Sequence, residues 1–249
     1  MYKFFITNNQ IKEDIITIIG QDVKHILNVL RLKKEDKIQI CIKETGKNYI
    51  CKIADIYPET VTCKILEESK TCLESNVSIT IFQGLPKADK MELIIQKCTE
   101  LGVKEIVPVE MERCVVKLDK KSEVKKIERW QKIAETAAKQ SKRNNICKIN
   151  NIINIKNICN LINEYDILLV PYENEENNSF KESLRTLVNK GTFKIGIVIG
   201  PEGGFEEKEI ELLKQNGGKI ITLGKRILRT ETVAIAMTSA IMYEFNELG

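Results

Sequence analysis

Several residue types and patterns are scarce in this 249-residue chain, and each absence narrows the possible functions. No apolar run approaches 18 residues, which excludes a membrane-spanning helix. His25 is the only histidine and no two of the eight cysteines have C-x-x-C spacing, so we expect no metal site. The N-terminus has no charged segment followed by a long apolar core, as a signal peptide has. We therefore expect a cytoplasmic protein without disulfides.

The net charge is only +4, but basic residues gather in one stretch. Residues 113–148 contain 12 Lys or Arg and 4 Asp or Glu, whereas residues 151–249 contain 11 and 14. A locally basic stretch in a nearly neutral protein is typical of binding to a polyanion. A solvated, lysine-rich helix explains the same composition, and the composition alone does not separate the two.

The first part of the chain, residues 1–72, has short alternating apolar segments split by turns. This pattern predicts a small β-barrel domain. Residues 22–30 have apolar side chains at helical spacing, which predicts one helix with Asp22 as its N-cap. We expect residues 3–6 to form a strand that pairs with residues 14–18.

The remainder, residues 73–249, alternates buried strands with amphipathic helices. This order predicts an α/β domain with a mostly parallel sheet flanked by helices. Ligands of such sheets bind at the carboxyl ends of strands. Three predicted strand ends carry unusual loops, at residues 170–173, 200–204 and 223–231.

The loop "GPEGGF", Gly200 to Phe205, matches neither of the common glycine-rich phosphate-binding patterns. The helix after it opens with three glutamates, at positions 206, 207 and 209, which would repel a phosphate at that helix N-terminus. A ligand with little negative charge that contacts the backbone, such as S-adenosylmethionine, suits the loop better. The alternative is a tight corner in which Gly203 and Gly204 adopt positive φ.

The loop "LGKRILRTET" joins a predicted strand to a helix whose first turns have small side chains. Small residues permit the close approach of a ligand or of another backbone. Thr230 or Glu231 could cap this helix. Arg226 and Arg229 could contact an anionic substrate, or they could form ion pairs with glutamates such as Glu202 or Glu231.

Five motifs occur together and in order: "KADKMELIIQKCTELGV", "ERCVVKL", "RWQKIAETAAKQSKR", "IGPEGGF" and "LGKRILRTET". The chain resembles the RsmE family of 16S rRNA methyltransferases, which use S-adenosylmethionine to methylate N3 of a uridine. The segment "DVKHILNVLRLKKEDKI" extends the resemblance to the family's PUA-like RNA-binding domain. Two positions depart from the family pattern, with Ala88 where glycine is usual and Val233 where alanine is usual, and they leave the fine packing in doubt.

The resemblance implies a PUA-like β-barrel at residues 1–72 and a SPOUT methyltransferase domain at residues 73–249. The SPOUT fold implies a C-terminal trefoil knot and a homodimer whose active site draws on both protomers. The expected substrate is 16S rRNA, within the 30S subunit or free. Two alternatives remain: a SPOUT methyltransferase acting on another RNA base or on ribose, and an RNA-binding protein without activity.

Methylation of uracil N3 requires loss of the imide proton, and the second domain has no histidine to accept it. We expect Arg229 to stabilise developing negative charge and Glu231 or Glu202 to accept the proton, although Glu231 could instead cap its helix. The expected cofactor-binding residues are Leu169, Val170, Pro171, Ile199, Gly200, Pro201, Gly203, Gly204, Leu223, Gly224, Ile227, Leu228 and Thr230. The expected RNA-binding residues are His25, Arg31, Lys33, Lys34, Lys87, Lys90, Arg113, Lys117, Lys139, Lys142 and Arg143.

Overall fold

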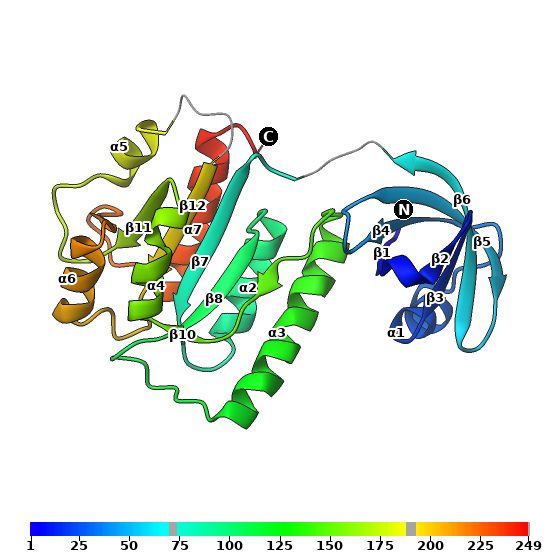
Figure 1. Ribbon diagram of the computed structural model, residues 1–249, viewed down its shortest axis with the longest axis horizontal. Helices are drawn as coiled ribbons and strands as arrows, with labels where there is room; N and C mark the ends of the chain where they lie inside the picture. The colour runs from blue at the N-terminus through cyan, green and yellow to red at the C-terminus, as the bar shows by residue number, and fades with distance from the viewer. Residues whose placement is uncertain (70–73, 188–192, 249) are drawn as a thin grey trace. The chain divides into compact units, whose positions relative to one another are not determined.

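A computed structural model describes residues 1–69, 74–187 and 193–248 of the chain, which divides into two compact units (Figure 1). The N-terminal unit comprises Met1–Glu74 and Ala138–Ile146, and the C-terminal unit comprises Ser75–Ala137 and Cys147–Gly249. Within the described ranges, no helix has the length and apolar character needed to cross a membrane.

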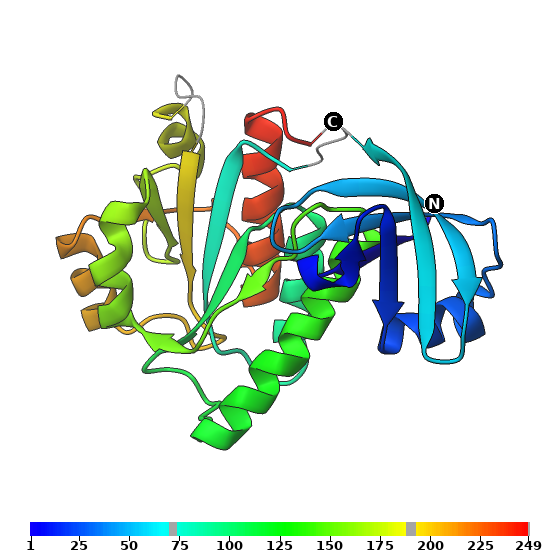
Figure 2. The same ribbon diagram turned by 45° about the vertical axis from the view of Figure 1, so that its right-hand side comes forward.

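The N-terminal unit is built on a curled six-stranded sheet, which Figure 2 shows. Its strands are β1 (Lys3–Ile6), β2 (Ile11–Lys12), β3 (Ile15–Ile19), β4 (Lys37–Ile42), β5 (Asn48–Ile56) and β6 (Thr60–Ser69). They lie in the order β1-β4-β5-β6-β3-β2, and only β1 and β4 are parallel. Among the described residues no pairing joins β1 to β2, so the sheet curls without the closure expected of a barrel.

In this unit the predicted strand pairing was wrong, whereas the predicted helix is present but has a different N-cap residue. The strand at residues 3–6 pairs with β4, because the strand at residues 15–19 pairs with β6 and β2 instead. The predicted helix is a short α1 (Gln21–Lys24) that continues as a π-helix, η2 (His25–Leu30), after the 3-10 turn η1 (Asn8–Gln10). Its N-cap is Gly20, with φ +74°, while the Asp22 carboxylate accepts a hydrogen bond from Lys139 Nζ at 2.8 Å.

The C-terminal unit contains a sheet of seven strands whose pairs are all parallel. The strands are β7 (Val77–Gly84), β8 (Glu105–Glu110), β9 (Lys148–Ile149), β10 (Ile153–Asn154), β11 (Ile167–Pro171), β12 (Phe193–Ile199) and β13 (Lys219–Ile221). The order is β10-β8-β7-β12-β11-β13, with β9 also beside β8. The predicted parallel α/β sheet is therefore confirmed.

Helices cover both faces of this sheet. They are α2 (Lys90–Glu100), α3 (Lys120–Gln140), α4 (Ile155–Leu161), η3 (Ile162–Glu164), α5 (Phe180–Arg185), α6 (Glu207–Gln215) and α7 (Thr230–Glu244). Helices α2 and α7 pack together on one face, and α4 and α6 lie together on the other (Figure 1). Gly102, with φ +102°, follows α2 as the helix-ending glycine that the sequence predicts.

Helix α3 begins at Lys120, whereas the sequence pattern predicts a start at Ser122, two residues later. Asp119 sets this start, because its Oδ1 accepts the Ser122 backbone N–H at 2.7 Å. The last residues of α3, from Ala138, belong to the N-terminal unit together with the segment that follows them. The basic stretch that the sequence singles out is therefore divided between the two units.

Six of the seven described cysteines are buried, and Cys72 lies outside the described residues. Burial raises the pKa of Cys51 and of Cys63 to about 12, so both thiols stay protonated at neutral pH. The cysteines thus act as small core side chains rather than as nucleophiles.

Candidate functional site

Three loops of the C-terminal unit meet at one edge of its sheet. Strands β11, β12 and β13 are parallel, with Leu169 opposite Ile197 and Pro171 opposite Ile221. Their carboxyl ends therefore lie side by side, and the loops that leave them adjoin. This edge is where ligands bind in parallel α/β sheets.

The first of these loops, Gly200 to Phe205, is a turn whose geometry favours glycine at two positions. Gly204 has φ +69°, and its N–H donates to the Pro201 carbonyl at 3.0 Å. A Cβ on Gly200 would lie 3.2 Å from the Gly204 carbonyl carbon and from the Phe205 ring. Gly203, which the sequence also allows at positive φ, instead packs against Arg113.

Arg113 braces this turn. Its Nε donates to Glu206 at 2.8 Å and its Nη1 donates to the Gly203 carbonyl at 3.0 Å. Glu206 and Glu209 form a reciprocal capping box that begins α6. These contacts explain the glutamates after the turn: they start a helix and hold Arg113, which positions the turn.

Two adjoining cavities, of about 560 Å³ and 360 Å³, open between the loops. The larger lies between residues 171–176 and residues 222–228, and the smaller reaches the Gly200–Phe205 turn and the start of α7. The two cavities share six lining residues: Pro171, Tyr172, Glu173, Ile227, Leu228 and Val233. The three loops therefore share one divided pocket.

Most of the predicted cofactor-binding residues line this pocket. They are Pro171, Ile199, Gly200, Pro201, Gly204, Leu223, Gly224, Ile227, Leu228 and Thr230. Leu169 and Val170, for which backbone contacts are predicted, do not line either cavity and have side chains buried in the core, and Gly203 faces Arg113. Val233, one of the two departures from the family pattern, lines both cavities. Its side chain is larger than that of alanine and takes up more of the pocket.

Three acidic side chains, Glu173, Glu175 and Glu176, line the larger cavity together with the basic Lys225 and Arg226; the sequence singles out the loop at residues 170–173 but misses Glu175 and Glu176. Glu173 lines both cavities, and its Oε1 lies 3.3 Å from the position of a Cβ on Gly204. Glu175 and Glu176 line the larger cavity only. Hydrogen bonds from the backbone N–H groups of Asn177 and Asn178 lower the pKa of Glu175, which keeps it ionised. The only available signal was their position directly after β11.

The predicted catalytic residues gather around Lys90 at the edge of the smaller cavity. Lys90 Nζ lies 2.8 Å from Glu202 Oε1 and 3.8 Å from Glu231 Oε2. Arg229 lines the cavity as the N-cap residue of α7, with an exposed side chain. Lys90, predicted to bind RNA, is thus engaged with the two carboxylates.

The two carboxylates differ in their partners. Glu202 Oε1 accepts hydrogen bonds from Lys90 Nζ and from the Lys87 backbone N–H. Partial burial works against its charged form, but these hydrogen bonds outweigh it and lower the pKa of Glu202. Glu231 Oε2 is buried and accepts no hydrogen bond from the described residues. Both hydrogen bonds of Glu202 reach Oε1, so among the described residues each carboxylate keeps at least one oxygen without a hydrogen bond.

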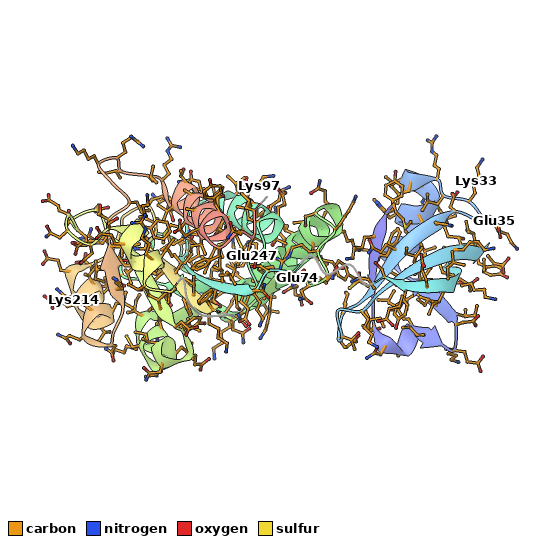
Figure 3. The ribbon with its side chains drawn as sticks, turned by 90° about the horizontal axis from the view of Figure 1, so that it is seen from above. Lys33, Glu35, Glu74, Lys97, Lys214 and Glu247 are labelled. Carbon is orange, nitrogen blue, oxygen red and sulfur yellow. The ribbon has the colours of Figure 1, made fainter. Side chains whose placement is uncertain are left out.

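The predicted RNA-binding residues fall on both units. His25, Arg31, Lys33 and Lys34 are exposed on the N-terminal unit, and Figure 3 shows the Lys33 side chain projecting outward. Lys139, Lys142 and Arg143 also belong to the N-terminal unit, not to the second domain in which the sequence places them. Lys87 and Lys117 are exposed on the C-terminal unit.

Arg143 does not have the exposure that a phosphate contact needs. Its side chain is only 5% exposed, and its Nη2 lies 2.6 Å from Glu74 Oε2. We therefore withdraw Arg143 from the RNA-binding set, because its guanidinium is committed to a buried ion pair. Within the described part of the chain, no three His, Cys, Asp or Glu side chains form a group that could hold a metal ion.

Comparison with known proteins gives the class first. Residues 73–242 match the RNA methyltransferase domain family, and residues 18–66 match the RNA methyltransferase PUA domain. The parallel sheet with its glycine-lined pocket is thus that of an RNA methyltransferase. Ribosomal RNA small subunit methyltransferase E of Bacillus subtilis (strain 168) is 38% identical over 98% of this chain and 97% of its own length. The chain belongs to the ribosomal RNA small subunit methyltransferase E family, which confirms the resemblance seen in its motifs.

Two solved structures support the same assignment. One is the structure of ribosomal RNA small subunit methyltransferase E from Neisseria gonorrhoeae bound to S-adenosylmethionine. It has a TM-score of 0.86 and 30% sequence identity, and the match covers 98% of both chains. That of a methyltransferase from Legionella pneumophila, also with bound S-adenosylmethionine, has a TM-score of 0.86 and 26% identity over 98% of this chain and 97% of its own.

Proposed function

We propose that this protein transfers a methyl group from S-adenosylmethionine to N3 of a uridine in 16S rRNA. The observation that carries the proposal is the divided pocket, in which three loops meet beside the Lys90, Glu202 and Glu231 cluster. Membership of the ribosomal RNA small subunit methyltransferase E family and the two relatives with bound S-adenosylmethionine support the same activity.

The pocket suits a cationic adenosine ligand without phosphate. Gly200 and Gly204 bring bare backbone to one wall, and Ile227 and Leu228 provide apolar surface on the other. The Glu173 carboxylate lies between these walls and complements a positive charge. We propose that these residues, with the other predicted cofactor residues of the pocket, hold S-adenosylmethionine.

When bound, S-adenosylmethionine supplies an electrophilic methyl group, and the target uracil must lose its N3 proton. We assign proton acceptance to Glu231, whose buried Oε2 has no hydrogen-bond partner among the described residues; Glu202, which lines the smaller cavity and is hydrogen-bonded only through Oε1, is the alternative. Lys90 Nζ lies 3.8 Å from Glu231 Oε2. Arg229, exposed at the cavity, stabilises negative charge that develops on the uracil oxygens.

RNA is bound by those predicted RNA-binding residues that are exposed and have no other role in the structure. On the N-terminal unit these are His25, Arg31, Lys33, Lys34 and Lys142, and on the C-terminal unit they are Lys87 and Lys117. Arg113 and Lys90 act instead on the pocket, and Lys139 forms an ion pair with Asp22. Exposed cations of this kind neutralise phosphates and confer no sequence preference by themselves.

We further propose that the protein acts as a cytoplasmic homodimer, with a trefoil knot formed around the glycine turn. Support for a dimer comes from the exposed apolar side chains of Leu93 and Tyr243 on the neighbouring helices α2 and α7. Support for the knot comes from the Thr230 hydroxyl, which donates to the Gly200 carbonyl at 2.7 Å and so joins the last helix to the turn. We propose domain limits at residues 1–72 and 73–249, which the family matches at residues 18–66 and 73–242 support, with residues 138–146 of the second domain belonging to the N-terminal compact unit.

A methyl-transfer assay tests the proposal. Labelled S-adenosylmethionine is incubated with the protein and with 30S subunits or protein-free 16S rRNA that lack the modification, and the product nucleoside is identified by mass. We expect 3-methyluridine at one position. Another methylated base, or a 2′-O-methyl product, would assign a different specificity, and cofactor-independent RNA binding without product would indicate an inactive binding protein.

A further inference from the structure

A buried hydrogen-bond chain ties the two walls of the pocket to the central strand β7. Gln83 Nε2 donates to Thr230 Oγ1 at 2.8 Å, and Thr230 Oγ1 donates to the Gly200 carbonyl at 2.7 Å. Gln83 is fully buried and Thr230 is 6% exposed. One side chain at the end of β7 is thereby linked to the glycine turn and to the first residue of α7.

The neighbouring residue strengthens this link. A Cβ on Gly84 would lie 2.7 Å from the nitrogen and Cδ of Pro201, so glycine allows the turn to rest directly on the end of β7. In the sheet, Gln83 stands opposite Ile199, the residue before the turn. Gln83 and Gly84 together form a platform beneath the glycine turn.

Helix stability alone does not explain these side chains. Thr230 is the first residue of α7 and lies after the N-cap Arg229, so its hydroxyl does not cap the helix. Gln83 Oε1 has no hydrogen-bond partner among the described residues, and an unpaired buried acceptor costs stability. An apolar side chain of similar size would avoid that cost. The Gln83 amide donates both to the Gly84 carbonyl at 3.0 Å, at the end of its own strand, and to the Thr230 hydroxyl, so it joins the platform to the first residue of α7.

We propose that Gln83 is a positioning residue for the methyl-donor pocket, acting through Thr230. Its amide holds the Thr230 hydroxyl in the orientation that donates a hydrogen bond to the Gly200 carbonyl. This hydrogen bond fixes the separation between the glycine turn and the loop before α7. The inference rests on the proposed S-adenosylmethionine site and adds a residue to it that does not touch the ligand.

The test measures the affinity for S-adenosylmethionine by calorimetry in three variants of the full chain: Gln83→Met, Thr230→Val and the double variant. Each single variant keeps the side-chain volume and removes one link of the chain. We expect affinity to fall about tenfold in each, or about 1.4 kcal/mol, and to fall little further in the double variant. Thr230→Ser, which keeps the hydroxyl, should restore most of the affinity lost in Thr230→Val.

Thr238→Val is the matched control. The Thr238 hydroxyl is also fully buried in α7 and donates to the Ala234 carbonyl at 2.7 Å, away from the pocket. The Thr238→Val variant should lower the melting temperature as the other variants do, yet keep the wild-type affinity for S-adenosylmethionine. Wild-type affinity in Gln83→Met, additive losses in the double variant, or an equal loss in Thr238→Val would each overturn the inference. A wild-type protein that does not bind S-adenosylmethionine would instead refute the proposed function.

Discussion

Glu74 attaches residues 138–146 to the rest of the N-terminal unit. Its Oε2 lies 2.6 Å from Arg143 Nη2, and its Oε1 accepts the backbone N–H groups of Asn144 and Asn145 at 2.8 and 2.9 Å. The Glu74 side chain is 17% exposed and the Arg143 side chain 5% (Figure 3 labels Glu74). One carboxylate therefore satisfies a buried cation and two backbone donors.

Replacing this carboxylate by an amide, Glu74→Gln, should destabilise the unit strongly. The amide can still accept a hydrogen bond, but the Arg143 guanidinium stays buried without a counter-charge. Breaking a buried ion pair by removing one partner costs about 3–5 kcal/mol. At about 3 kcal/mol, the local opening that exposes the Asn144 and Asn145 amides becomes more than about 100-fold more frequent.

The same pair makes stability depend on pH. Burial alone would raise the pKa of Glu74, but the ion pair with Arg143 and the two backbone N–H groups outweigh it and lower that pKa below its ordinary 4.5. A carboxyl whose pKa is lowered by folding stabilises the protein above its unfolded-state pKa. That stabilisation is lost as the pH falls through the folded-state pKa. The wild type should therefore lose stability below about pH 4.5, and Glu74→Gln should show a shallower loss.

Hydrogen exchange followed by mass spectrometry or NMR reads this effect locally, so it does not assume that both units unfold together. The amides of Asn144 and Asn145 are compared in the wild type, in Glu74→Gln and in Glu68→Gln, together with urea unfolding at pH 7 and pH 4. Glu68 is the control, because it also loses one charge in this unit but pairs with Lys47 at 4.0 Å with both side chains more than half exposed. Exchange in Glu74→Gln as slow as in Glu68→Gln would refute the role given to Glu74.

Three further predictions concern activity, strain and RNA. Glu231→Gln should lower kcat by about 100-fold or more and leave S-adenosylmethionine affinity within about threefold, measured by single-turnover methylation and calorimetry with Glu211→Gln as control. Ala88 has φ +52°, so Ala88→Gly should raise the free energy of unfolding by about 1 kcal/mol in a urea titration; a decrease would contradict the strain argument. RNA affinity should fall steeply with salt, and Arg31→Ala should reduce the slope of log K against log salt by about 0.7–0.9, whereas an unchanged slope would remove Arg31 from the RNA contacts.

The alternation of strands and helices was sufficient to predict the parallel sheet, because buried strands and amphipathic helices leave distinct patterns over many residues. Pairing in the N-terminal unit was harder to predict. Residues 3–6 pair in parallel with β4, a partner more than thirty residues away, although a nearby apolar segment follows. Alternating patterns show which residues form strands but carry no information on which strands adjoin. The place of residues 138–146 in the N-terminal unit depends on buried contacts to Glu74 and Lys3, which are equally invisible in a local pattern.

The site was predicted where backbone chemistry constrains the residue type. Gly200 and Gly204 were found because a turn at a strand end needs them, and both line the pocket. Gln83 was missed, since a polar residue inside an otherwise apolar strand gives no hint of its partner 147 positions later. The Ala88 departure was read as a packing change, but Ala88 has φ +52°, a conformation that glycine adopts without strain.

The glutamates at positions 206, 207 and 209 do not line the pocket, whereas those at positions 173, 175 and 176 do. Glu206 and Glu209, whose charge was expected to repel phosphate, cap α6 and hold Arg113 and the Glu112 backbone N–H. They therefore do not form the lining of the pocket. The negative charge in the pocket comes from Glu173 and its neighbours after β11, which meet the glycine turn from the opposite side. These carboxylates line the larger cavity together with Lys225 and Arg226, so they favour a cation beside Glu173 without making the pocket as a whole acidic.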